Sequence, residues 1–203
     1  MRRALFVSVL GVLGACSGDD GPSGAVDAST DSSTADASTI DAAIDAPAGV
    51  FRLTSATITE GGTIPLTHVC AQRGGTNTSP ALSFANPPAG TMSFAVVLTD
   101  TTNGLVHSAI YDVPGILTGL PADVDKVYAP PDVAGAHQPV SYQVGVRGYN
   151  GPCPGTQHTY QFKIYALGTA ALPGAMMNTS KDQVVTIAAT NLGTATLTAT
   201  FTP

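Results

Sequence analysis

Four side chains suited to acid–base chemistry or anion binding occur where predicted strands begin or end. Asp100 ends one apolar run, and His107 directly precedes another. His158 and Tyr160 lie where a turn rich in Gly, Pro and Cys passes into an alternating segment. Loops at one edge of a sheet can meet, so these residues are candidates for a single pocket.

This combination favours a site for a small anion or a phosphate monoester. A protonated imidazole donates a charge-assisted hydrogen bond to a phosphate oxygen, and a tyrosine adds a neutral donor. The aspartate could orient an imidazole or accept a hydrogen bond from an amine of the ligand. A single histidine at the end of a strand is more often structural. A hydrolase or a metal site built on Asp100, His107 and His158 is the catalytic alternative.

Metal and cofactor sites have little support in the sequence. Neither His-x-x-x-His nor Cys-x-x-Cys spacing occurs, and no nucleophile is evident beside the candidate pocket. We therefore expect no metal, no cofactor and no enzymatic activity.

The elements that must position these residues are predicted to be mostly strands. Apolar runs and period-two alternation predict strands at 51–58, 93–99, 109–113, 140–146, 160–167 and 195–201. Ser180-Lys-Asp-Gln183 is a capping-box pattern, followed by Val184, Ile187 and Ala188 on one helical face and by Gly193 as a stop. The pattern predicts a mostly β fold, an antiparallel Greek-key-like β-sandwich with one or two short helices near the C-terminus.

The N-terminal residues predict export. Arg2 and Arg3 precede an apolar run at 4–15, which is too short to span a bilayer and is typical of a signal peptide at 1–15. Cys16 follows Leu13-Gly14-Ala15, as in a bacterial lipobox, so we expect it to carry lipid. The alternative is an ordinary signal peptide with Cys16 incidental. Ser17 after the cysteine suggests, by analogy with other lipoproteins, an exported lipoprotein of the cell envelope in the outer membrane.

Residues 16–49 have the composition of a disordered linker. After Cys16 this segment has no aromatic residue and no Lys or Arg, and seven aspartates lie among Ala, Ser and Thr. The remaining residues, 50–203, are enough for one domain. This domain has six Lys or Arg against seven Asp or Glu, and the absence of a basic stripe argues against nucleic acid as a partner.

Two cysteines remain for the domain itself. Cys70 and Cys153 form an even pair in an exported, oxidising setting, which favours a disulfide. Two free buried thiols are the alternative.

Several spaced motifs resemble those of the phosphatidylethanolamine-binding proteins, in particular their bacterial Raf-kinase-inhibitor-like branch. They span roughly residues 51–201 in the family's order. The matching segments are Gly75-Thr-Asn77-Thr-Ser79-Pro80-Ala-Leu82, Pro87-Pro88-Ala-Gly90-Thr-Met-Ser93, Thr99-Asp100, His107-Ser-Ala-Ile-Tyr-Asp-Val-Pro114, Gly151-Pro-Cys-Pro154 and His158-Thr-Tyr160.

The resemblance implies a β-sandwich with a small anion pocket at one end. Its ligand-binding residues would be Asp100, His107, Pro154, His158 and Tyr160, and it also implies pairing of Cys70 with Cys153. The chain departs from the family pattern at four places. Ser108 stands in place of Trp, and Thr101-Thr102 in place of Pro-Asp. Gly155 stands in place of Pro, and Thr159 in place of Arg.

The function expected from these observations is a membrane-tethered binding module for phosphorylated or anionic headgroups, a Raf-kinase-inhibitor-like protein. Its partners would be a small anionic ligand and, through the N-terminal lipid, a membrane; no protein partner is indicated. A surface structural or adhesive domain with a relic pocket is one alternative, and the hydrolase is another.

Overall fold

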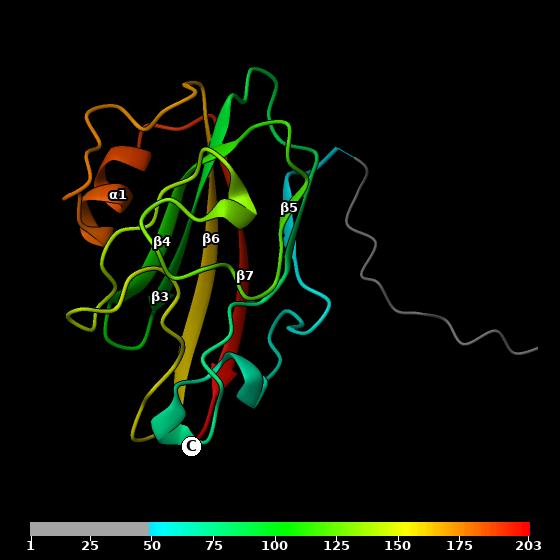
Figure 1. Cartoon of the computed structure of the whole chain (residues 1–203). Coiled ribbons are helices and arrows are strands. Elements are labelled where there is room, and N and C mark those ends of the chain that lie inside the picture. Colours follow the sequence, from blue (N-terminus) through cyan, green and yellow to red (C-terminus); the bar gives the residue numbers. More distant parts are fainter. Residues whose placement is uncertain (1–48) are drawn as a thin grey trace, which may run out of the picture. The chain divides into compact units, whose positions relative to one another are not determined.

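Two antiparallel sheets form the part of the chain that the structure describes, residues 49–203 of a computed structural model (Figure 1). The predicted signal peptide, Cys16 and nearly all of the linker lie outside the described residues. Within residues 49–203, no helix is long and apolar enough to cross a membrane.

The larger sheet has the strand order β4-β3-β6-β7, and the smaller has the order β1-β2-β5. The larger sheet contains β3 Ser93–Asp100, β4 Leu105–Pro114, β6 His158–Leu167 and β7 Gly193–Phe201. The smaller contains β1 Arg52–Thr54, β2 Leu82–Ala85 and β5 Gly119–Leu120. Three short 3-10 helices lie in loops: η1 Leu66–His68, η2 Ala71–Arg73 and η3 Pro131–Val133.

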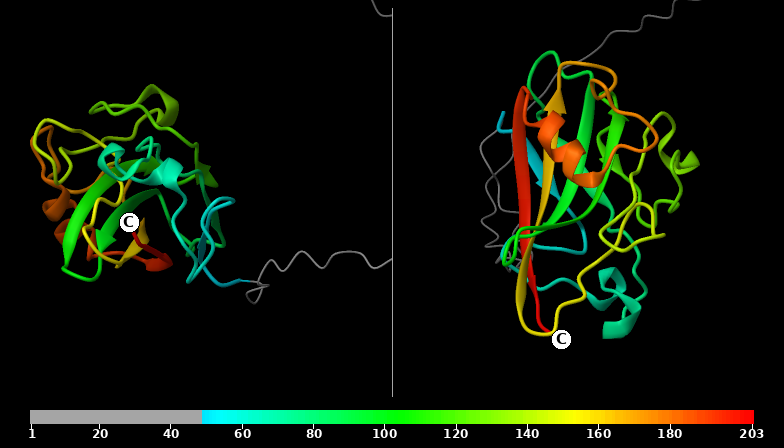
Figure 2. Two further views of the ribbon diagram at one scale, coloured as in Figure 1. Left: turned by 90° about the horizontal axis from the view of Figure 1, so that it is seen from below. Right: turned by 90° about the vertical axis from the view of Figure 1, so that its left-hand side faces the viewer.

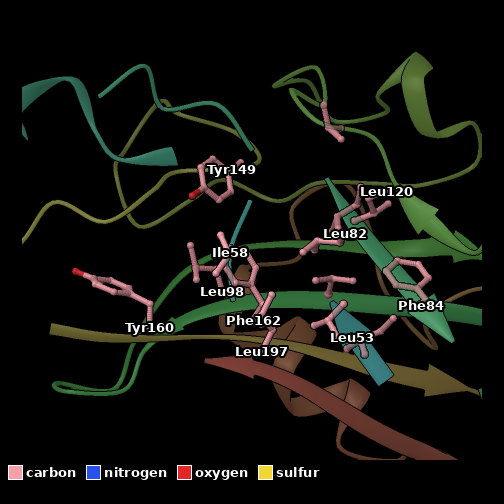
Figure 3. Packing of buried hydrophobic residues seen from close by; sticks show 14 of the residues in the cluster. Leu53, Ile58, Leu82, Phe84, Leu98, Leu120, Tyr149, Tyr160, Phe162 and Leu197 are labelled. Carbon is pink, nitrogen blue, oxygen red and sulfur yellow. The ribbon is translucent and has the colours of Figure 1, made fainter. Parts of the chain in front are cut away.

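Both faces of the larger sheet are covered, which explains the nearly continuous apolar sequence of β3. One face packs on the smaller sheet through Phe94 and through Leu98 and Phe162. Figure 3 shows Leu98 and Phe162 beside Leu53 and Phe84 of the smaller sheet. The other face packs under helix α1, Lys181–Ala188, through Val97 and Tyr111. Figure 2 shows this helix on the outer side of the sheet. The fold predicted from the sequence, mostly β with a short helix near the C-terminus, is confirmed.

The predicted capping box is present at α1. Ser180 Oγ accepts from the Gln183 N–H at 3.2 Å, and Gln183 Oε1 accepts from the Ser180 N–H at 2.8 Å. Val184 and Ala188 are buried, as expected for one apolar face. The predicted stop at Gly193 is wrong, because the helix ends at Ala188 and Gly193 already begins β7.

The predicted strand at 140–146 is also wrong. This segment is a loop, held by one isolated bridge between Val140 and Arg147. Gly145 has a φ of 82°, which ends the alternating pattern in a turn, and Val144 is 95 % exposed. The first strand is shorter than predicted, and the sequence pattern did not reveal β2 or β5, because runs of four and two residues are too short to show a period.

A small cavity of about 40 Å³ lies between the sheets beside Ser108. Its walls are mostly apolar and include Leu82, Leu98 and Phe162, which Figure 3 shows together. Ser108 is 5 % exposed and is part of the cavity wall. The small side chain in place of the family's tryptophan therefore leaves unfilled volume in the core.

Filling this cavity should stabilise the protein. Ser108→Val adds apolar volume on a strand, toward the cavity that Ser108 lines, so we expect a gain of about 1 kcal/mol in the free energy of unfolding. Denaturant titration measures this value. The matched control is Ser83→Val on β2, where the serine is exposed and a change within about 0.5 kcal/mol is expected. Equal effects of the two substitutions would contradict the cavity assignment.

Candidate functional site

The antiparallel order of the larger sheet brings three strand ends together. Strand β3 ends where its neighbours β4 and β6 begin. Asp100 pairs with Tyr160 on β6 and with Leu105 on β4. His107 is two residues further along β4, and His158 is the first residue of β6. The site lies at the end of the sheet that carries the C-terminus in Figure 1, because His158 pairs with Phe201.

All five residues predicted to bind ligand line one pocket of about 230 Å³. This volume is smaller than the 300–1,000 Å³ typical of sites for drug-sized ligands, so it suits a small ligand group. Four residues in the wall were not predicted: Asn103, Leu105, Tyr142 and Cys153. Tyr142 was missed because it falls in the segment that was wrongly predicted to be a strand. Among residues 49–203 no cluster of three or more His, Cys, Asp or Glu is arranged to hold a metal ion.

Asp100 and His158 form a close pair inside the pocket. His158 Nδ1 lies 2.5 Å from Asp100 Oδ2, and since the carboxylate accepts, Nδ1 carries the proton. The other oxygen, Oδ1, accepts from the N–H of Thr102 at 3.0 Å. Asp100 is only 2 % exposed, so these contacts satisfy a buried charge. The pair fixes the ring of His158 and leaves its Nε2 as the nitrogen that can meet a ligand.

His107 is held in a different way. Its Nδ1 donates to the backbone carbonyl of Asn150 at 3.1 Å, which leaves Nε2 as an acceptor in the neutral ring. Its ring lies 4.4 Å from that of Tyr142 and meets Tyr160 edge-on at 5.4 Å, measured between centroids. Burial lowers the pKa of His107 below 6.5, although the Asn150 carbonyl and the Asp100 charge oppose this shift. The imidazole is therefore mostly neutral at pH 7.

Tyr160 lies between the two histidines. Its ring centroid is 6.4 Å from that of His158 and 5.4 Å from that of His107. Burial, and then the charge of Asp100, raises the pKa of the Tyr160 phenol. The hydroxyl therefore keeps its proton, and a hydrogen bond to the Asp100 carboxylate is among the causes of the shift.

The turn that carries Pro154 is tied to a distant loop at three points. The predicted disulfide between Cys70 and Cys153 is present, with a Cα–Cα distance of 5.4 Å. The Cys70 N–H donates to the Pro152 carbonyl at 3.0 Å, and the Gly151 N–H donates to Asn77 Oδ1 at 2.8 Å. A Cβ at Gly151 would lie 2.0 Å from the His68 carbonyl oxygen, so only glycine fits this close approach.

The residues that depart from the family pattern have distinct roles. Ser108 lines the inter-sheet cavity and not the pocket, because neighbouring residues of β4 point to opposite faces. Thr102 Oγ1 accepts from the Thr159 N–H at 2.9 Å, and the Thr101 N–H donates to the Thr159 carbonyl at 2.8 Å. These threonines thus connect the loop after β3 to the start of β6.

Comparison with known proteins agrees with this fold. The family described as Phosphatidylethanolamine-binding protein matches residues 54–202, and the chain belongs to this family. It is 34 % identical over 155 residues to the UPF0098 protein YbcL of Escherichia coli (strain K12), covering 67 % of this chain and 84 % of that protein. It is 33 % identical over 126 residues to YbhB from the same organism, covering 58 % and 78 %.

Solved structures place it in the same bacterial branch. The crystal structure of Escherichia coli YbcL, described as a new member of the mammalian PEBP family, superposes with a TM-score of 0.67 at 33 % identity, covering 75 % of this chain and 98 % of that one. A putative phosphatidylethanolamine-binding protein homolog from Chlamydia trachomatis gives a TM-score of 0.63 at 25 % identity, covering 76 % and 99 %. The chain is thus a member of the bacterial branch that contains YbcL and YbhB.

Loss of the disulfide should destabilise the domain strongly. The bridge joins residues 83 positions apart, and closing a loop of that length contributes about 4–5 kcal/mol in the chain-entropy model. The reference is Cys16→Ser, which keeps the bridge. The triple variant Cys16→Ser/Cys70→Ser/Cys153→Ser lacks it, and we expect its free energy of unfolding to be lower than that of the reference by about this amount. Urea denaturation of both variants measures the difference. A loss below about 1 kcal/mol would show that the hydrogen bonds hold the turn without the bridge.

Proposed function

We propose that this chain is an exported lipoprotein, anchored through Cys16 in the outer membrane, whose domain binds a small anionic or phosphorylated group and catalyses no reaction. The family supports a ligand pocket at this end of the sheet. The single observation that carries the proposal is that His107, His158 and Tyr160 line one hollow of about 230 Å³ together with Asp100.

Each wall residue has a distinct part in binding. His158 Nε2 donates to the anion when its ring is protonated, and its charge is then balanced by Asp100 behind it. The Tyr160 hydroxyl keeps its one proton at any pH below its raised pKa, so it can donate to the ligand by turning from the Asp100 carboxylate. His107 Nε2 accepts from a protonated phosphate oxygen when the ring is neutral, and donates when the ring is protonated. Asp100 is already engaged by Thr102 and His158, so it positions His158 rather than contacting the ligand.

A second hollow shares one wall residue with the pocket. Tyr142 also lines a neighbouring hollow of about 740 Å³, whose walls include Arg147, Met176 and Lys181. A phosphate group held in the small pocket could therefore belong to a larger molecule. The rest of that molecule would pass over the Tyr142 side chain into the larger hollow.

A hydrolytic function is the second candidate, and one observation favours it. The Asp100–His158 pair orients an imidazole with a free Nε2, which is the arrangement of a general base acting on water. Hydrolysis of p-nitrophenyl phosphate or acetate that is lost in Asp100→Asn would support this candidate against a binding module. A chain that neither binds anions nor hydrolyses esters would instead fit a structural surface domain.

Removing the His158 imidazole should weaken anion binding. A charge-assisted hydrogen bond contributes about 1.5–3 kcal/mol, so His158→Ala should lower the affinity for inorganic phosphate or phosphoethanolamine by roughly 10- to 100-fold. Calorimetric titration measures the affinity. The matched control is His137→Ala, which breaks a similar pair with Asp112, at 3.0 Å, outside the pocket. An equal loss in both variants would argue against the site. His158→Gln tests whether the loss comes from the unpaired Asp100, because glutamine can still donate to that carboxylate.

Anion binding should also depend on pH with a defined sign. The anion favours the protonated imidazole, and burial lowers the pKa of His107 from its ordinary value of 6.5. Affinity should therefore continue to rise as the pH falls below 6.5, through the lowered pKa. His107→Gln should remove this part of the rise while His137→Gln keeps it. Phosphate affinity that is flat below pH 6.5 in the parent chain would contradict the role of His107. Circular dichroism at each pH checks that the chain stays folded, since a lowered histidine pKa makes the folded state less stable as the pH falls below 6.5.

A further inference from the structure

The end of the domain opposite the pocket has no charged side chains in its loops. Four segments form this end: 86–92, 114–118, 168–174 and 189–193. Backbone hydrogen bonds show that they are neighbours. The Met92 N–H donates to the Leu167 carbonyl and the Leu192 N–H to the Ala166 carbonyl, both at 2.8 Å. The Gly115 N–H donates to the Met92 carbonyl at 2.9 Å.

Large apolar side chains are exposed at this same end. Ile116 is 91 % exposed and Met92 is 54 % exposed. Leu192 and Val50 are about half exposed, at 47 % and 49 %. Exposed apolar side chains that gather on one surface commonly mark an interaction site. We call Val50, Met92, Ile116 and Leu192, with the four uncharged loops, the apolar end.

The N-terminal part of the chain joins the domain at the apolar end. Gly49 and Val50 are the first described residues, and the Val50 carbonyl accepts from Asn86 Nδ2 at 3.2 Å. The next residue, Phe51, packs on Phe94 near the start of β3, with ring centroids 6.2 Å apart. Figures 1 and 2 show the chain entering the domain, in cyan, near the start of β7 and away from the C-terminus. The segment that carries Cys16 therefore attaches beside these exposed side chains.

The pocket lies at the other end of the same strands. Strand β6 runs for ten residues from His158 at the pocket to Leu167 beside Met92. At about 3.3 Å per residue, the two ends are roughly 30 Å apart.

We propose that the apolar end rests on the surface of the membrane that anchors the chain, so that the pocket faces away from the lipid. Val50, Met92, Ile116 and Leu192 enter the interfacial layer. The inference rests on the lipid anchor at Cys16 in the proposed function. A lipid surface fits this end because its four loops carry no charge that would have to leave water; Arg52, which pairs with Ala85 at the start of β1, is a charged residue at this end and is half-buried. The lack of Lys and Arg in these loops also means that contact does not depend on anionic lipid or on low salt.

The absence of tryptophan from the natural chain allows a direct test. Ile116→Trp places a single tryptophan at the apolar end, and Gln157→Trp places one on the exposed turn at the pocket end. Each full chain, acylated in cells, is reconstituted into vesicles of phosphatidylethanolamine and phosphatidylglycerol with and without brominated acyl chains. We expect severalfold stronger quenching and a blue-shifted emission for Ile116→Trp, unchanged by salt. Adding Met92→Asp to Ile116→Trp should reduce the quenching.

The possible outcomes separate the orientation of the domain, the lipid anchor and self-association. Equal or absent quenching at the two positions in an acylated chain overturns the orientation while leaving the anchor intact. Absence of quenching together with concentration-dependent association of the detergent-solubilised chain would assign the apolar end to a second copy. If mass spectrometry finds no acyl group on Cys16, both the anchor and this inference fail. Phosphate titration of the same samples reports on the pocket independently.

Discussion

The buried carboxylate of Asp100 is the constraint on which the geometry of the pocket depends. At 2 % exposure, an ionised group without partners would be strongly unfavourable, and breaking a buried pair costs about 3–5 kcal/mol. Thr102 and His158 together satisfy both oxygens. This arrangement requires β3 to end beside the first residues of β6, with the loop after β3 folded back on the carboxylate. The hydrogen bond between Asp100 and His158 then fixes the position, the tautomer and the orientation of the His158 ring.

The other half of the pocket is held by connections between distant segments. His107 takes its orientation from the carbonyl of Asn150, and the turn that follows Asn150 is fixed by the bridge to Cys70 and by Asn77. The rim of the site is therefore rigid where it carries Pro154, even though this turn belongs to no strand. Such a rigid loop on a sheet edge lowers the entropic cost of binding a small ligand.

The two ends of the larger sheet have opposite characters. Ionisable and hydroxyl-bearing side chains gather at one end, where β6 begins, and uncharged loops with exposed apolar residues form the other. The strands between them are covered on both faces, so they act as a spacer of fixed length. In a chain attached to a membrane through its N-terminus, the placement of these two ends on opposite sides of the domain would separate the binding site from the lipid.

Much of the fold and of the candidate site could be predicted because both rest on local patterns. The long strands β3, β6 and β7 show apolar runs or alternation, and the capping box at Ser180 marks the start of α1. The segment at 140–146 misled the prediction, since its alternation resembles a strand although Gly145 turns the chain. The strands β2 and β5 were missed because they are stabilised by pairing with distant partners and not by their own pattern.

By itself, the sequence determined the residue types of the pocket, the cysteine pair and the periodicity of the long strands, because these properties are written in neighbouring residues. Only the tertiary structure decided that Asp100 pairs with His158 and not with His107, that Tyr142 enters the wall, and that Ser108 borders a separate cavity. The physical reason is that these relations depend on strand register, on loop closure and on which face of a strand a side chain occupies. Those quantities are set by contacts between distant segments, such as the disulfide that joins residues 83 positions apart.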